Sequence, residues 1–131
     1  MLVCLTISAC APNEESRSLV GSWTLTAYGP VDSPTPAVPD VDAIVTFSED
    51  GSVAGTTGCN EFGGDYTVEG DQITFGQIVS TLILCPELQM AQEEAMYQVL
   101  VETASFNIEG DTLTIIKNDT ALVFTAAASG S

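Results

Sequence analysis

Short strand-like segments separated by glycine turns constrain the fold of this chain more than any other feature. In each segment apolar residues alternate with polar ones, as in a strand with one buried face. Glycine supplies the positive φ that tight hairpin turns require. The turns are Ser48-Glu49-Asp50-Gly51, Glu69-Gly70-Asp71 and Glu109-Gly110-Asp111, and the flanking segments are 43–47, 52–56, 64–68, 72–75, 105–108 and 112–116. This pattern predicts a series of antiparallel hairpins.

Two further strands and one loop extend this pattern. Residues 21–29 alternate with the same period, and residues 121–125 follow a turn at 117–119. The loop at 30–42 contains four prolines, at positions 30, 34, 36 and 39. Because proline cannot donate a hydrogen bond to a central strand, we expect a stiff surface loop there.

The segment after Cys85 predicts one helix, at about residues 86–101. Pro86 and Glu87 suit a first helical turn, where proline loses no hydrogen bond and a carboxylate meets the positive end of the helix dipole. We expect an apolar face at helical spacing, formed by Leu88, Ala91, Ala95, Met96, Val99 and Leu100. Such a face is too narrow for membrane binding, so the helix is expected to pack on the sheet.

These elements predict an α+β domain with about eight mostly antiparallel strands. The strands are expected to form a strongly curved sheet or incomplete barrel, with the helix packed on it. The expected organisation along the chain is a signal peptide remnant with a lipobox at 1–10, a flexible tether at 11–19, the folded domain at 20–125 and a disordered tail at 126–131.

Charge and composition exclude several classes of function. The chain has 18 acidic residues, only Arg17 and Lys117 as basic ones, no histidine, and a formal net charge of −16. Two basic residues cannot neutralise a row of phosphates, so no nucleic acid is expected as a partner. Anionic lipid head groups are repelled as well. Without histidine, the usual Cys-His nucleophilic site and the His-bound zinc site are absent, and no metal or cofactor is indicated.

The N-terminal residues indicate export. An uncharged apolar run ends in Ile7-Ser8-Ala9-Cys10, which resembles the bacterial lipobox, whose cysteine receives a lipid. We therefore expect lipidation at Cys10, a membrane contact through this anchor, and a location in the cell envelope, at the outer membrane or the outer face of the cell membrane. Because no basic n-region precedes the run, the natural start is expected upstream of Met1. The alternative is an N-terminal strand that contains a cysteine.

The remaining cysteines form a possible pair. If Cys4 leaves with the signal and Cys10 is lipidated, Cys59 and Cys85 are left. Disulfides persist in the oxidising environment of exported proteins, so a Cys59–Cys85 bond is expected. A pair of free buried thiols is the competing interpretation.

Five motifs in order resemble the META domain (HslJ-like) family, over about residues 20–125. They are Trp23-Thr-Leu25, Gly55-Thr-Thr-Gly58-Cys59-Asn60, Phe62-Gly63-Gly64-Asp65-Tyr66, Thr81-Leu-Ile-Leu-Cys85 and Glu94-Ala-Met-Tyr97-Gln-Val-Leu100. The family motif residues that we expect to act structurally are Trp23, Gly55, Gly58, Cys59, Asn60, Gly63, Tyr66, Thr81, Cys85, Glu94 and Tyr97. The chain departs from the family pattern at Ile83-Leu84, where Met-Ala is expected.

The resemblance implies a small cell-envelope domain, often a lipoprotein, without established enzymatic chemistry. It also implies stress-linked or secretion-linked roles in some members, and a fold similar to lipid-binding secretion pilot proteins. We therefore expect a monomeric, non-enzymatic lipoprotein domain that binds a protein or a hydrophobic partner in the groove between helix and sheet. The alternative is a secreted, protease-inhibitor-like or structural module that presents the loop at 30–42.

Other site chemistries find less support in the sequence. Cys59 as a nucleophile has no histidine base, and a copper(I) site would have to combine Cys59 and Cys85 with Met90 and Met96. A carboxylate hydrolase would need two converging acids from the set Asp40, Asp42, Glu61, Asp65 and Glu94. The acidic stretches at 40–42, 49–50 and 65–71 lack the spacing of a calcium loop. Gly58 and Asn60 have a simple role as turn residues.

Overall fold

The computed structural model describes residues 19–127. The signal remnant, the lipidation at Cys10, most of the tether and the end of the tail therefore lie outside the described residues. None of the helices within 19–127 has the length and apolar character needed to cross a membrane.

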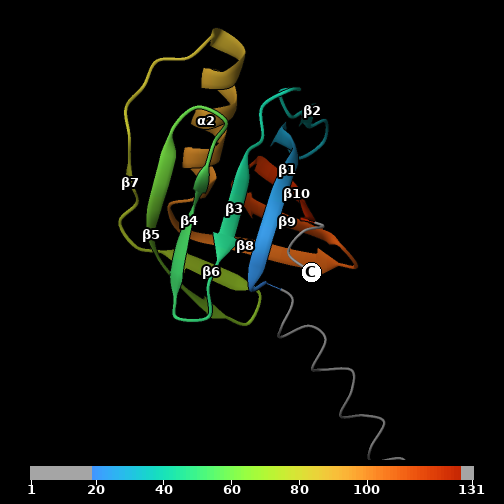
Figure 1. Cartoon of the computed structure of the whole chain (residues 1–131). Helices are drawn as coiled ribbons and strands as arrows, with labels where there is room; N and C mark the ends of the chain where they lie inside the picture. The colour runs from blue at the N-terminus through green and yellow to red at the C-terminus, as the bar shows by residue number, and fades with distance from the viewer. Residues whose placement is uncertain (1–18, 128–131) are drawn as a thin grey trace, which may run out of the picture.

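Eight antiparallel strands form a closed barrel (Figure 1). The ring order is β1-β3-β4-β5-β6-β8-β9-β10, and β10 pairs back with β1. The strands are β1 (Gly21–Pro30), β3 (Ile44–Phe47), β4 (Ser52–Thr56), β5 (Glu61–Glu69), β6 (Gln72–Phe75), β8 (Glu102–Glu109), β9 (Thr112–Lys117) and β10 (Thr120–Ala126). The predicted α+β class with antiparallel strands is confirmed, and the curved sheet closes completely. The predicted turns join β3 to β4, β5 to β6 and β8 to β9.

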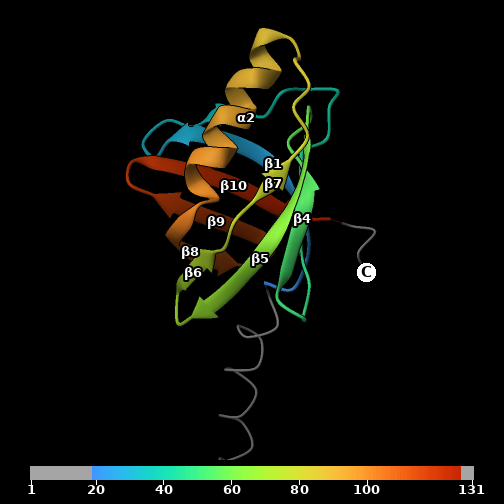
Figure 2. The same cartoon turned by 90° about the vertical axis from the view of Figure 1, so that its left-hand side faces the viewer.

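Two short strands lie beside the ring. β2 (Thr35–Pro36) pairs with β1 and holds part of the proline-rich loop to the barrel. β7 (Val79–Ser80) pairs with Phe62 and Gly63 of β5, beyond the stretch of β5 that pairs with β6. The chain thus leaves β6, runs up along β5, and enters the helix at the far end of the barrel (Figure 2).

The barrel core consists of the inward-facing side chains of the strands. Its largest fully buried members are Phe47, Phe124, Ile73, Leu113, Ile115 and Leu122. Burying each of these side chains contributes about 1.5–3 kcal/mol. The Trp23 ring nitrogen donates to the Leu19 carbonyl at 2.9 Å, which satisfies the polar atom of this buried ring.

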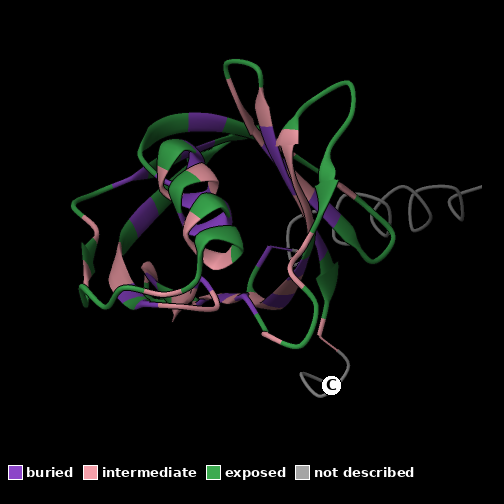
Figure 3. Cartoon of the chain, turned by 90° about the horizontal axis from the view of Figure 1, so that it is seen from above, coloured by how far each residue is buried: buried purple, intermediate pink, exposed green. Residues whose placement is uncertain are grey.

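The helix α2 (Glu87–Val99) packs on β10, β1 and β9. Seen from above, it lies inside the outline of the strand ring (Figure 3). Its inward face consists of Gln92, Glu93, Met96 and Val99. The predicted apolar face is therefore wrong in the first half of the helix, where Leu88 is 67% exposed and Ala91 is exposed. The first turns of α2 extend beyond the barrel core. They meet loops whose backbone groups lack a backbone partner, and the polar side chain of Gln92 binds two of these groups.

Candidate functional site

A buried polar cluster joins the β4–β5 turn to α2. Its members are Thr57, Asn60, Gln92 and Glu93, with exposures of 0%, 2%, 0% and 7%. Charged side chains are almost never buried unless they are paired or hydrogen-bonded. The contacts of this cluster therefore decide whether it is a reactive site or a structural one.

The Glu93 carboxylate accepts four hydrogen bonds from the turn between β4 and β5. Its Oε1 accepts from the Thr57 hydroxyl at 2.6 Å and from the Asn60 backbone N–H at 3.2 Å. The Asn60 side-chain amide donates to both carboxylate oxygens, at 3.0 and 3.1 Å. Through these hydrogen bonds Glu93 joins the β4–β5 turn to α2.

Asn60 also holds the segment that leads into the helix. Its Oδ1 accepts from the Thr81 hydroxyl at 2.8 Å and from the Ile83 N–H at 2.6 Å, and its Nδ2 donates to the Ile83 carbonyl at 3.1 Å. The Thr81 N–H in turn donates to the Glu61 carbonyl at 3.0 Å. The side chain of Asn60 was expected to stabilise its own turn. It fixes residues 81–83 instead, and the Thr57 hydroxyl accepts from the N–H groups of Cys59 and Asn60 within the turn.

Gln92 ties the proline-rich loop to the same junction. Its Oε1 accepts from the Val38 N–H and its Nε2 donates to the Thr57 carbonyl, both at 2.8 Å. Sequence reasoning missed Gln92 and Glu93, because polar residues in a helix usually face solvent. A signal was present: both precede the buried Met96 by three or four positions and therefore share its face. Glu94, the acid that the resemblance indicates, is exposed.

The Cys59–Cys85 disulfide is confirmed, with the two Cα atoms 6.1 Å apart. Met90 packs beside it, where its sulfur accepts from the Cys85 N–H at 3.4 Å and lies 3.9 Å from the Cys59 sulfur. A disulfide sulfur is neither a thiolate nucleophile nor a thiolate ligand, so this bond removes the chemical basis of the nucleophile and copper hypotheses.

The acids considered for a hydrolase all lie at the surface. Asp40, Asp42, Glu61, Asp65 and Glu94 are all exposed. Among residues 19–127, no group of three or more His, Cys, Asp or Glu side chains is arranged to hold a metal ion.

The glycines and the first tyrosine of the family motif have structural contacts. A Cβ at Gly55 would collide with the Ile44 backbone of the neighbouring strand, and Gly58 has a φ of 99°. Gly63 pairs with Ala54 and Val79, between β4 and β7. The Tyr66 hydroxyl donates to the Ser48 carbonyl at 2.7 Å. Burial raises the pKa of Tyr66, and the charges of Asp50 and Glu49 add to the rise.

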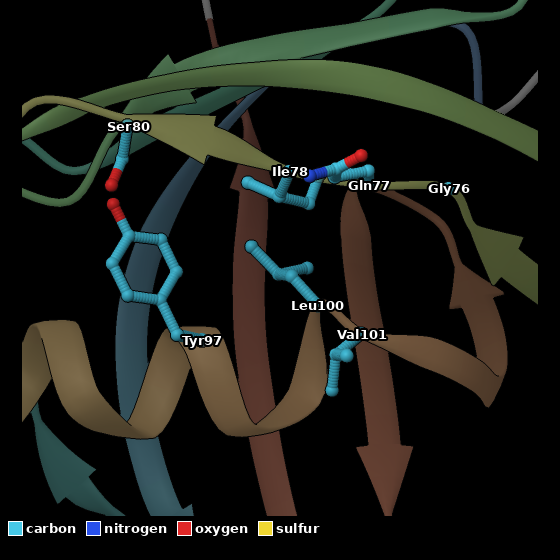
Figure 4. A pocket seen from close by; sticks show the side chains of 7 residues that line it. All are labelled: Gly76, Gln77, Ile78, Ser80, Tyr97, Leu100 and Val101. Atoms are coloured by element: carbon cyan, nitrogen blue, oxygen red, sulfur yellow. The ribbon is translucent and has the colours of Figure 1, made fainter.

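A cavity of about 340 Å³ lies between the end of α2 and the connection from β6 to β7. It is lined by Gly76, Gln77, Ile78, Ser80, Tyr97, Leu100 and Val101 (Figure 4). None of these side chains is acidic or basic. The lining is mostly apolar, with the Ser80 and Tyr97 hydroxyl groups at one end and the Gln77 amide apart from them (Figure 4).

Tyr97 gives this cavity its main polar feature. Its hydroxyl oxygen is buried without a hydrogen-bond partner, although it points toward Ser80 in Figure 4. Its ring meets Phe62 edge to face, with the ring centres 6.0 Å apart. Burial raises the pKa of the Tyr97 phenol and outweighs the opposing effect of the nearby Ser80 hydroxyl, which does not meet hydrogen-bond geometry; the Glu93 carboxylate adds to the rise.

Comparison with known proteins connects this geometry to a family. A family model described as "META domain" matches residues 17–129. No curated protein matches the chain significantly. A protein from Burkholderia xenovorans, solved by NMR, is similar in structure with a TM-score of 0.70 at 22% identity, over 88% of each chain.

Two Bacteroides crystal structures share the fold. A DUF4847 family protein from Bacteroides vulgatus has a TM-score of 0.59 at 13% identity, over 86% of this chain and 96% of its own. A lipocalin-like protein from Bacteroides uniformis has a TM-score of 0.55 at 22% identity, over 84% of this chain and 99% of its own. At these identities the likeness shows a lipocalin-like fold, and neither protein is described as an enzyme.

Proposed function

The chain belongs to the META domain family, and on this premise we propose that it is a non-enzymatic, lipid-anchored binding domain of the cell envelope. Its binding site is the cavity between α2 and the β6–β7 connection, and its ligand is an apolar group of a partner molecule. A stress-related role of this domain would also be located in the cell envelope.

The cavity is the observation that carries this proposal. Ligand sites are typically concave and apolar, with a few polar groups that orient the ligand. Ile78, Leu100 and Val101 supply apolar walls, and Gln77 and Ser80 supply the polar groups. A volume of about 340 Å³ is at the small end of such sites, so it fits a short acyl chain or one large side chain.

The charge of the protein supports a covalent attachment to the membrane. With a formal net charge of −16, the domain cannot approach anionic head groups through electrostatic attraction. A lipid on Cys10 would hold it there. Labelling cells with a radioactive fatty acid tests this part: the wild type should be labelled, and Cys10→Ala should not.

Binding of the neutral apolar dye Nile red tests the cavity. We expect the dye to bind and its emission to shift to shorter wavelength. Val101→Trp should weaken binding about tenfold, because the indole would occupy the cavity from a position that is 39% exposed. The matched control is Val31→Trp, which adds the same side chain at a position that is 44% exposed and outside the cavity. Equal affinity of the two variants for the dye would show that the cavity is not the binding site.

The alternative, a protease inhibitor that uses the loop at 30–42, has less in its favour. The disulfide lies elsewhere, at positions 59 and 85, and the loop is held instead by Gln92 and by the pairing of β2 with β1. Exposure of residues 31–36 is its one supporting observation.

A further inference from the structure

Large apolar side chains are exposed along the segment from β7 to the first turn of α2. We name this set the apolar strip: Val79 (67% exposed), Leu82 (92%), Ile83 (56%), Leu84 (89%) and Leu88 (67%). Single exposed apolar residues are normal, but five of them within one short segment indicate an interaction site.

The backbone of the strip is held in one place. Thr81 is hydrogen-bonded to Glu61, and both backbone groups of Ile83 are hydrogen-bonded to the side chain of Asn60. Cys85 closes the segment through the disulfide to Cys59. The buried polar cluster thus fixes a segment whose own side chains remain in solvent. A surface that is already ordered loses less conformational entropy when a partner binds.

The charges around the strip determine what kind of partner fits. Glu61, Glu87 and Glu94 are exposed acids on the elements that carry or flank it. No lysine or arginine occurs between Arg17 and Lys117 in the sequence, and Lys117 is paired with Glu102 at 3.0 Å. A second copy of this acidic chain would be repelled, as would an anionic membrane. A basic partner would be attracted and oriented.

The position of the strip also favours a protein over a membrane as its partner. α2 begins at the end of the barrel opposite the start of β1 in both side views (Figures 1 and 2). The lipid anchor proposed above, on which this orientation rests, would precede β1 and hold the opposite end of the barrel toward the membrane. The strip is then directed away from the lipid surface.

We propose that the apolar strip is a docking surface for a protein segment that combines apolar side chains with lysine or arginine. Leu82, Leu84 and Leu88 contact the apolar side chains of this segment, and the acids around them meet its positive charges. The surface lies outside the lining of the cavity, so the two can be tested separately.

The test measures binding of synthetic amphipathic peptides by fluorescence anisotropy at fixed ionic strength. A Leu/Lys peptide should bind the wild type, and a Leu/Glu peptide of the same pattern should not. Leu82→Ser with Leu84→Ser should weaken Leu/Lys binding about tenfold or more without changing any charge. The matched control is Val20→Ser with Val68→Ser, at positions 41% and 45% exposed elsewhere on the surface, and it should bind like the wild type.

Several results would overturn the proposal. Equal affinity of the Leu82/Leu84 variant and the wild type would show that the peptide follows charge alone. If the Leu/Glu peptide bound the wild type as tightly as the Leu/Lys peptide, the positive charge of the partner would not contribute to binding. A wild-type dimer that the two serines dissociate would identify a second copy as the occupant, and strip-dependent binding to phospholipid vesicles would identify a membrane. Nile red binding should be unchanged by the two serines, which separates this proposal from that of the cavity.

Discussion

The side-chain amide of Asn60 donates to both carboxylate oxygens of Glu93, at 3.0 and 3.1 Å, and so connects the start of β5 to the middle of α2. The same amide group accepts from Ile83 N–H and Thr81 hydroxyl. One buried pair therefore sets the positions of the turn, the helix and the strip segment.

Glu93→Gln should destabilise the protein by about 1–3 kcal/mol, because it leaves buried donors unsatisfied. Whichever way the new amide turns, its NH2 group faces the Asn60 Nδ2 donor. Urea unfolding at neutral pH measures the change. Glu94→Gln removes the same charge from the exposed neighbour and should change stability by less than about 0.5 kcal/mol. Identical urea midpoints for the two variants would show that the hydrogen bonds of Glu93 do not stabilise the junction of turn and helix.

Reduction of the Cys59–Cys85 bond should lower Tm by about 10 °C. The bond joins residues separated by 26 positions, and closing such a loop contributes about 3.5 kcal/mol through the entropy of the unfolded chain. Calorimetry with and without a reducing agent measures the shift. The double variant Cys59→Ser with Cys85→Ser is the control, since its Tm should not respond to the reductant. An unchanged wild-type Tm would mean that the bond contributes nothing to stability.

Gln92→Ala should release the loop at 30–42 from the helix. The Val38 N–H and the Thr57 carbonyl would lose their partner, so protease cleavage within residues 31–38 should become several-fold faster. Limited proteolysis followed by mass spectrometry locates the cuts. Gln98→Ala, an exposed position on the same helix, should be cleaved like the wild type. Equal cleavage rates in the two variants would show that Gln92 does not hold the loop.

The Tyr97 phenol should reduce stability at alkaline pH. Burial raises its pKa above the ordinary value of 10.0, so the folded state keeps the phenolic proton in a pH range where the unfolded state loses it. Stability is therefore unaffected below pH about 10 and falls as pH rises toward the folded-state pKa. Thermal melts from pH 8 to 11 should show the wild type losing stability relative to Tyr97→Phe.

At neutral pH, Tyr97→Phe should cost little, because the hydroxyl that it removes has no hydrogen-bond partner. A difference between the two proteins that stays constant with pH would refute the raised pKa.

Local signals predicted the local structure of this protein. The turns around Gly51, Gly70 and Gly110 and the helix start at Pro86 depend on residues close together in sequence, and each lies where the pattern placed it. The Cys59–Cys85 pairing followed from the number of cysteines and from the expectation that the protein is exported.

The features that sequence reasoning missed depend on distant partners. Burial of Gln92 and Glu93 makes sense only beside the backbone of Val38 and the side chains of Thr57 and Asn60. Leu88 was expected inside because it is apolar, but no core extends to that end of the helix. The cavity and the closure of the barrel likewise arise from segments that pack only in three dimensions.

The pairing of β1 with β10 has a consequence for when the protein can fold. Trp23 in the first strand of the barrel pairs with Ala126 in the last, so the ring stays open until nearly the whole chain is present. Such non-local pairing slows folding, which for domains of this kind takes about milliseconds to seconds. A truncation before residue 120 would remove the partner strand of β1, and proteases should clear its product faster than the full-length chain.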